Sequence, residues 1–142
     1  MKLDIHNEVE GFIPPTQKLN QIISSLTKRP VELVITDADS IQAVNLQTRG
    51  INKATDVLSF PFIGKGKKSP LGSVMINVKA VEQKASELGH TQDEEFCLLF
   101  IHGVLHLLGY DHEVDNGEMR AKEKALIEQF HLPKSLIVRT ES

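Results

Sequence analysis

Residues 96–108, FCLLFIHGVLHLL, form the most apolar stretch of the chain, and its only strongly polar side chains are His102 and His106. The stretch is too short to span a membrane and is apolar on nearly all sides, so it predicts a helix buried at the centre of a globular fold. Residues four apart lie on one helical face, about 6 Å from each other. The pattern therefore indicates two buried imidazoles that point to the same place.

The segment after this helix supplies a third histidine. Gly109 can end the helix in the left-handed conformation, and the turn that follows can bring His112 back to the same place. Residues 102–112, HGVLHLLGYDH, then have the spacing HxxxHxxGxxH of metzincin zinc sites. Three imidazoles leave a tetrahedral Zn²⁺ with one open position, which is the catalytic arrangement. We predict one zinc ion per chain, held by His102, His106 and His112.

Histidine also has an ordinary structural role, because a lone buried imidazole is usually a hydrogen-bonded core residue. We interpret the remaining three histidines in that way: His6, His90 and His131. The same interpretation of the triplet would leave imidazoles without partners in an apolar helix, at a cost of about 1–3 kcal/mol each. A metal site is therefore the favoured interpretation of the triplet.

Two residues beside the predicted ligands bear on the chemistry. Gly103 stands where an HExxH peptidase has its catalytic glutamate, and glycine cannot accept a proton, so peptide hydrolysis by that mechanism is disfavoured. Asp111 is the carboxylate nearest to the third ligand in the sequence. It either accepts a hydrogen bond from a ligand imidazole or caps the turn, and both alternatives stay open.

Strand-like and helix-like patterns alternate on both sides of the central helix, with no repeat or long linker. They predict a single α+β domain over residues 1–142, with a small mixed sheet packed against helices. We expect strands at 2–6, 30–36, 57–62 and 71–78, and helices at 19–26, 39–46, 78–88 and 119–130. Pro61 places its strand at an edge or shortens it, and Thr91 with Glu94 forms a capping-box pattern before the central helix. Phe60, Phe62 and Cys97 are expected in the core.

The composition favours a soluble cytoplasmic protein. Of 142 residues, 40% are hydrophobic, no apolar run is long enough for a membrane span, and a single cysteine excludes an internal disulfide framework. The formal charge of −3 argues against an indiscriminate polycation. Residues 47–70, however, hold five basic residues and one acidic residue, so a locally positive cleft is compatible with this charge. In this segment Lys65, Lys67 and Lys68 either contact an RNA backbone or form a solvated loop.

Two blocks of the sequence resemble the YbeY family of metal-dependent endoribonucleases. They are HGVLHLLGYDH at residues 102–112 and NLQTRGINKATDVLSFPF at residues 45–62, followed by LGSVMINV. The resemblance implies a zincin-like α+β fold, a three-histidine zinc site on the central helix and an arginine near the metal, which falls on Arg49. One departure is Ser73, where the family more often has an aspartate, so this chain has no carboxylate at that position.

The resemblance also implies a function. The family acts on single-stranded ribosomal RNA, in the maturation of 16S ribosomal RNA and in ribosome quality control. The small ribosomal subunit and its assembly factors are then the expected partners, and neither DNA nor a membrane is expected. Phosphodiester cleavage builds negative charge on the phosphoryl oxygens, and the planar guanidinium of Arg49 can bind two of them. A solvated surface arginine is the alternative role for this residue.

Two other functions stay open at this stage. The first is a non-catalytic ribosome-assembly factor in which zinc only braces the end of the central helix. The second is a metallopeptidase, which the histidine spacing suggests and Gly103 disfavours.

Overall fold

The structure is a computed structural model that describes residues 3–64, 66, 68–111 and 114–133. The described strands and helices follow the chain in this order: β1 (Leu3–Asn7), α1 (Thr16–Leu26), β2 (Val31–Thr36), α2 (Ala38–Arg49), β3 (Val57–Pro61), β4 (Gly72–Asn77), α3 (Val78–Leu88), α4 (Gln92–Leu107) and α5 (Glu118–Phe130). Each of these elements overlaps a segment expected from the sequence. The boundaries differ by up to about four residues, mostly where helices begin or end.

The four strands form one mixed sheet in the order β1-β2-β4-β3. β1 pairs with β2 and β2 pairs with β4 in parallel, whereas β3 runs antiparallel to β4. Parallel neighbours need crossover connections, and here these contain α1 and α2. β3 lies at an edge and ends at Pro61, as expected of a residue that cannot donate to a ladder. The predicted α+β class with a small mixed sheet is confirmed.

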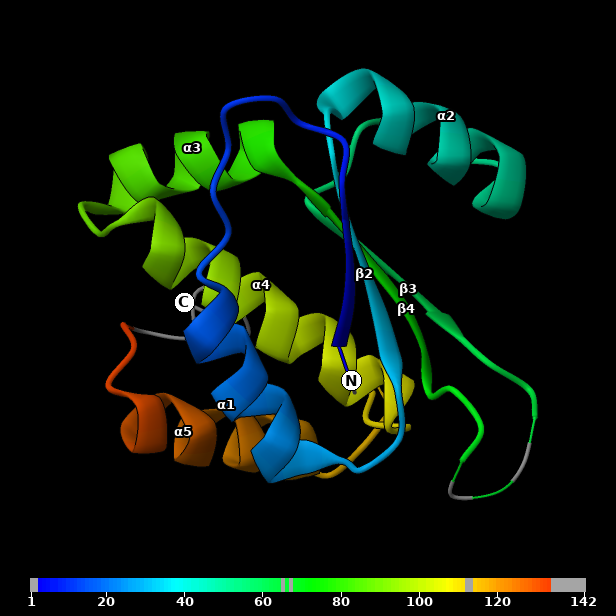
Figure 1. The fold of residues 1–142 in the computed structure, drawn as a ribbon, viewed down its shortest axis with the longest axis vertical. Helices are drawn as coiled ribbons and strands as arrows, with labels where there is room; N and C mark the ends of the chain where they lie inside the picture. Colours follow the sequence, from blue (N-terminus) through cyan, green and yellow to red (C-terminus); the bar gives the residue numbers. More distant parts are fainter. Residues whose placement is uncertain (1–2, 65, 67, 112–113, 134–142) are drawn as a thin grey trace.

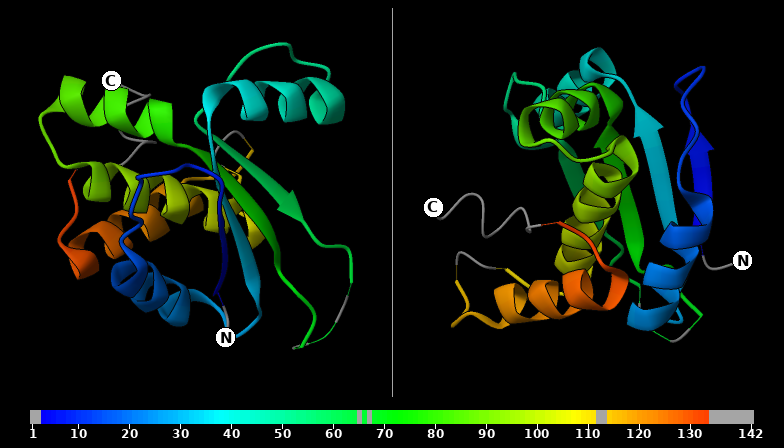
Figure 2. Two further views of the ribbon diagram at one scale, coloured as in Figure 1. Left: turned by 45° about the horizontal axis from the view of Figure 1, so that its top comes forward. Right: turned by 90° about the vertical axis from the view of Figure 1, so that its left-hand side faces the viewer.

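The helices cover the two faces of the sheet unequally. Figure 1 shows α2 alone on one face, while α1, α3, α4 and α5 lie on the other, and the views in Figure 2 agree. α4 occupies the middle of the larger group, because it packs on β3 and β4 and also contacts α1, α3 and α5. Its apolar side chains are buried from Phe96 to Leu107. The prediction of a central buried helix is therefore confirmed.

Gly103 marks the close approach of α4 to the sheet. A Cβ atom at this position would lie 2.7 Å from Cγ1 of Val74 and 3.2 Å from Oγ of Ser59. The Ser59 hydroxyl also donates a hydrogen bond of 2.9 Å to the carbonyl oxygen of Gly103. Glycine is thus required by packing, and a glutamate in the HExxH position would have no room.

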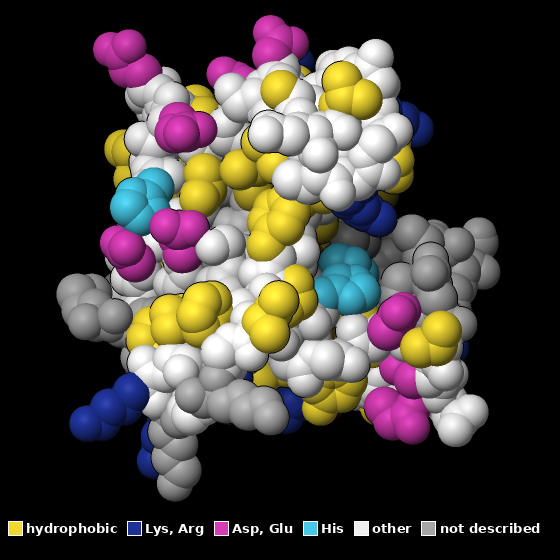
Figure 3. Space-filling model, turned by 90° about the vertical axis from the view of Figure 1, so that its right-hand side faces the viewer, with side chains coloured by type: hydrophobic (Ala, Val, Ile, Leu, Met, Phe, Trp, Pro, Cys, Tyr) yellow, Lys and Arg dark blue, Asp and Glu magenta, His cyan; other side chains and the backbone are white. Residues whose placement is uncertain are grey.

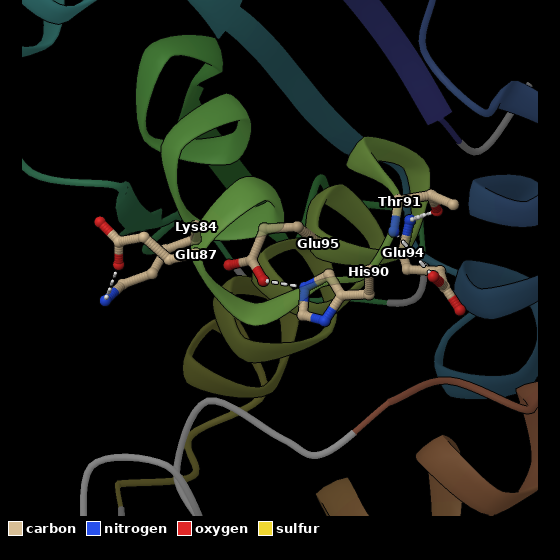
Figure 4. A network of polar contacts seen from close by, with 6 residues as sticks. All are labelled: Lys84, Glu87, His90, Thr91, Glu94 and Glu95. Carbon is tan, nitrogen blue, oxygen red and sulfur yellow. Dashed lines mark hydrogen bonds and ion pairs between the residues drawn. The ribbon is translucent and has the colours of Figure 1, made fainter.

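The first turn of α4 is held by the expected capping box (Figure 4). Thr91 Oγ1 accepts a hydrogen bond from the Glu94 N–H at 3.0 Å, and Glu94 Oε1 accepts one from the Thr91 N–H at 2.9 Å. The Thr91 N–H holds the pKa of the Glu94 carboxyl below its ordinary value. Beside the box, His90 Nε2 lies 2.8 Å from Oε1 of Glu95, whose side chain is fully buried. His90 therefore fits the expected hydrogen-bonded structural role.

Other expectations about buried residues need correction. His6 is not a core residue, because it lies on the side of the sheet away from α4 and its side chain is 51% exposed. His131 is also exposed, since it ends α5 in the left-handed conformation at φ 54°. Phe62 lies beyond the end of β3 and is 52% exposed, whereas Phe60 is half-buried. Cys97 is buried as expected.

None of the helices in the described part of the chain combines the length and the hydrophobicity needed to cross a bilayer.

Candidate active site

His102 and His106 lie on consecutive turns near the end of α4, and their side chains converge. Their Nε2 atoms are 3.2 Å apart, and the two ring planes meet at 83°. Two nitrogen ligands of a tetrahedral zinc ion at about 2.0–2.1 Å would be separated by about 3.3 Å. The two imidazoles therefore fit two corners of a zinc site. His112, the third predicted ligand, lies outside the described residues and stays a prediction.

The two histidines line a cleft of about 450 Å³. The other lining residues come from the end of α2, from β3 and from the segment that joins them: Arg49, Thr55, Asp56, Val57, Ser59 and Pro61. The cleft thus brings together the two blocks of sequence that resemble the YbeY family. Arg49 and the paired imidazoles line the same space, and their roles stay predictions.

Two buried asparagines shape the wall of this cleft. α2 ends after Arg49 because Gly50 adopts the left-handed conformation at φ 70°. Asn45, on the buried side of α2, donates from Nδ2 to the carbonyl oxygen of Lys53 at 2.9 Å. Asn77, at the end of β4, donates from Nδ2 to the carbonyl oxygen of Thr55 at 3.1 Å. The segment between α2 and β3 is therefore held from both sides.

The view in Figure 3 faces the side of the sheet that carries α2 and shows histidine side chains at two separate places. One of them lies beneath a basic side chain next to a hollow, which matches the cleft lined by Arg49, His102 and His106. The other is bordered by acidic side chains.

That second place corresponds to an exposed group formed by Asp4, His6 and Glu32. Their potential ligand atoms lie within 4.8 Å of one another. His6 Nε2 is 3.0 Å from Oδ2 of Asp4 and 3.4 Å from Oε2 of Glu32, so an imidazole between two carboxylates accounts for the arrangement. Ser73 adjoins this group, because its hydroxyl donates to Oε1 of Glu32 at 2.7 Å. Ser73 is not among the residues that line the cleft of Arg49 and His102.

Of the remaining predicted site residues, the structure describes Lys68 and Asp111. Lys68 is exposed and is not among the lining residues of the cleft, whereas Lys65 and Lys67 lie outside the described residues. The carbonyl oxygen of Asp111 accepts hydrogen bonds from the N–H groups of Val114 and Asp115 at 3.2 and 3.1 Å. Its backbone therefore begins a turn, and the proposed contact of its carboxylate with a ligand imidazole stays a prediction.

Two carboxylates near the histidines were not singled out from the sequence. Asp56 lines the cleft; its position directly before an apolar strand is the signal that could have identified it. Glu123, on α5, is fully buried, and its Oε2 lies 3.6 Å from Nδ1 of His102. No local pattern could have found Glu123, because only the packing of α5 on α4 brings it to the histidine.

Together, the fold and the site define a small α+β protein with a candidate histidine metal centre in a cleft lined by an arginine. The chain belongs to the family described as endoribonuclease YbeY, whose sequence model matches residues 3–131. The resemblance noted in the sequence is confirmed, and so is the enzyme class, an RNA-cleaving hydrolase, at the level of the family.

Relatives support this assignment, and a solved structure supports the fold. The endoribonuclease YbeY of Sulfurimonas denitrificans is 54% identical over 139 residues, covering 98% of this chain and 93% of the relative. The endoribonuclease YbeY of Campylobacter jejuni is 59% identical over 122 residues, covering 86% and 90%. The solution structure of TM1509 from Thermotoga maritima matches with a TM-score of 0.61 and 29% identity, covering 90% of this chain and 88% of that one.

Proposed function

We propose that this chain is a zinc-dependent endoribonuclease that cleaves single-stranded ribosomal RNA. Its place would be in 16S ribosomal RNA maturation and ribosome quality control, in the cytoplasm, with the small ribosomal subunit and its assembly factors as partners. One domain over residues 1–142 would carry the activity. Membership of the YbeY family supports cleavage of RNA. The observation that carries the metal chemistry is the 3.2 Å separation of the His102 and His106 Nε2 atoms in the cleft that Arg49 lines.

In this proposal His102, His106 and His112 hold the zinc ion, with one ion per chain. The donor set fits, because neutral imidazoles are common zinc ligands and three of them leave a position open. When bound, zinc supplies a Lewis acid that polarises the phosphodiester and lowers the pKa of water.

The residues of the cleft divide the remaining tasks. The Arg49 guanidinium binds the phosphoryl oxygens and stabilises the negative charge that develops on them. Asp56 is a carboxylate that lines the cleft. Because Gly103 has no side chain to accept a proton, Asp56 is the candidate proton acceptor for the reaction. Lys65, Lys67 and Lys68 would bind the RNA backbone without selecting a sequence.

The size of the cleft supports a flexible substrate. A volume of about 450 Å³ lies in the range of small-ligand pockets. A nucleotide of a single strand can turn its phosphate into such a space, whereas an A-form duplex holds its backbone in a fixed helical path. The volume of the cleft is therefore compatible with a single-stranded substrate.

The test is to measure zinc content and cleavage of a ribosomal RNA fragment for the wild type and two variants. We expect His106→Ala to lose both zinc and cleavage. Arg49→Glu should keep its zinc and cleave about 100-fold more slowly or worse, because it removes a charge that stabilises the transition state. Two controls should behave as the wild type: His131→Asn at an exposed histidine, where asparagine tolerates the left-handed conformation, and Lys84→Glu on α3.

Undiminished cleavage by zinc-free His106→Ala would overturn the proposal. If no variant and no wild-type protein cleaves RNA, while RNA binding persists, the assembly-factor alternative replaces it. Zinc-dependent turnover in a peptide-hydrolysis screen would instead indicate a metallopeptidase.

A further inference from the structure

Glu123 occupies an unusual environment for a carboxylate. Its side chain is fully buried between α5 and α4, and Oε2 lies 3.6 Å from Nδ1 of His102, whose side chain is 12% exposed. A buried charge is costly unless a partner or a metal compensates for it. The question is therefore what this carboxylate does beside a predicted metal ligand.

The orientation of the His102 ring answers it. Nε2 faces Nε2 of His106 and the predicted metal position, so Nδ1 is the nitrogen that points away from that position, toward Glu123. A neutral imidazole that binds a metal through Nε2 carries its proton on Nδ1 and must donate it to an acceptor. Glu123 is the carboxylate placed on that side.

We propose that Glu123 is a positioning residue of the metal centre: its carboxylate accepts a hydrogen bond from the Nδ1–H group of His102, which sets the tautomer and orientation of the ring and makes it a stronger metal ligand. This inference rests on the proposed zinc site but not on RNA cleavage. The separation of 3.6 Å is longer than a hydrogen bond of up to about 3.2 Å. Such contacts are often long before the site is filled and shorten in the working complex.

Removing one partner of a buried polar pair usually lowers the stability of the fold. Fold stability is therefore measured separately from zinc affinity, so that a role of Glu123 toward the metal is told apart from a structural role. The carboxylate additionally links α5, far along the chain, to the ligands on α4.

The experiment compares the wild type with Glu123→Met, Glu123→Gln and Glu128→Gln. The first variant removes the acceptor at similar volume, the second keeps an uncharged acceptor, and the third is a matched control at an exposed position of the same helix. Proteins are stripped of metal, and the dissociation constant for zinc is measured by competition with a chelating dye. The unfolding temperature of the zinc-free proteins and the NMR signal of the His102 Nδ1 proton with zinc bound complete the readout.

We expect Glu123→Met to bind zinc about 10- to 100-fold more weakly than the wild type. The hydrogen-bonded Nδ1 proton signal should disappear, and the unfolding temperature of the zinc-free variant gives the loss of fold stability separately from the loss of zinc affinity. The zinc affinity of Glu123→Gln should lie between those of the wild type and Glu123→Met. The zinc affinity of Glu128→Gln should match that of the wild type.

Glu123→Met binding zinc as tightly as the wild type, with an unchanged Nδ1 proton signal, would overturn the proposal. If Glu123→Met fails to fold, Glu123→Gln decides in the same way, because unchanged zinc affinity together with an unshifted Nδ1 proton contradicts the assigned role. A wild type that binds no zinc contradicts the metal centre itself. A wild type that binds zinc without cleaving RNA contradicts only the proposed function, and zinc affinity still decides the role of Glu123.

Discussion

The side-chain amide of Asn77 donates a hydrogen bond of 3.1 Å to the carbonyl oxygen of Thr55. The same side chain caps α3, because its Oδ1 accepts from the Lys79 N–H at 3.0 Å. Its backbone N–H also donates to the carbonyl oxygen of Asp56 at 2.9 Å. One residue thus begins a helix and holds two residues that line the cleft.

Replacing Asn77 should therefore affect stability and activity together. We expect Asn77→Ala to lower the free energy of unfolding by about 1–3 kcal/mol, because it removes a helix cap and a buried hydrogen bond. Cleavage of RNA should also slow, since Thr55 loses the side-chain hydrogen bond that holds it, although the backbone bond to Asp56 remains. Asp37→Ala is the matched control: it removes the N-cap of α2, which Asp37 forms with the Ser40 N–H at 2.8 Å, but no bond to the cleft wall. Equal loss of activity in both variants would contradict this assignment.

Gly103→Ala should destabilise the protein by about 1–3 kcal/mol, because the new methyl group would press on Val74 between α4 and the sheet. Urea unfolding measures the change. Gly64→Ala is the control, since its Cβ would meet only the exposed ring of Phe62, which can rotate, and we expect a change within about 0.5 kcal/mol. A wild-type unfolding curve for Gly103→Ala would show that α4 can move away from the sheet.

Gly103→Glu tests the peptidase alternative directly. It restores the HExxH pattern, but the packing leaves no room for the side chain. We expect poorly folded protein and no zinc-dependent peptide hydrolysis. A folded variant that hydrolyses peptides would show that only the missing glutamate separates this site from a peptidase.

The capping box makes part of the stability depend on pH. The Thr91 N–H lowers the pKa of Glu94 below its ordinary value of 4.5, so the ionised carboxylate stabilises the folded state above that value. This contribution is lost as the pH falls through the lowered pKa. The wild type should therefore exceed Glu94→Gln in stability at pH 7, and the difference should shrink as the pH falls below about 4.5. Unfolding curves across this range check the sign; a difference that grows toward acid would refute it.

Cys97 should be unreactive while the protein is folded. Burial raises the pKa of its thiol to about 12, so the nucleophilic thiolate is scarce at neutral pH. We expect a thiol reagent such as dithiobis-nitrobenzoate to label the chain slowly in buffer and rapidly in denaturant. Rapid labelling of the native protein would show that the start of α4 opens readily.

Much of the fold could be predicted because its signals are local. The apolar run through α4, the Thr91–Glu94 box and the alternating strands each depend on neighbours in the chain. The exposures of His6 and Phe62 could not be predicted in this way. A strand pattern does not say which face a helix will cover or where an edge strand leaves the sheet.

The sequence by itself determined that two histidines share a face of a buried helix, since a spacing of four on a 3.6-residue period leaves no other outcome. Through its resemblance to the YbeY family, the sequence also indicated Arg49 and the surrounding residues 45–62 as part of the site. Only the tertiary structure decided that residues between Arg49 and Pro61 line a cleft with those histidines. It also decided that Oε2 of Glu123 lies next to Nδ1 of His102. These contacts join residues far apart in the chain, and they depend on how the helices and the sheet exclude water together rather than on any local pattern.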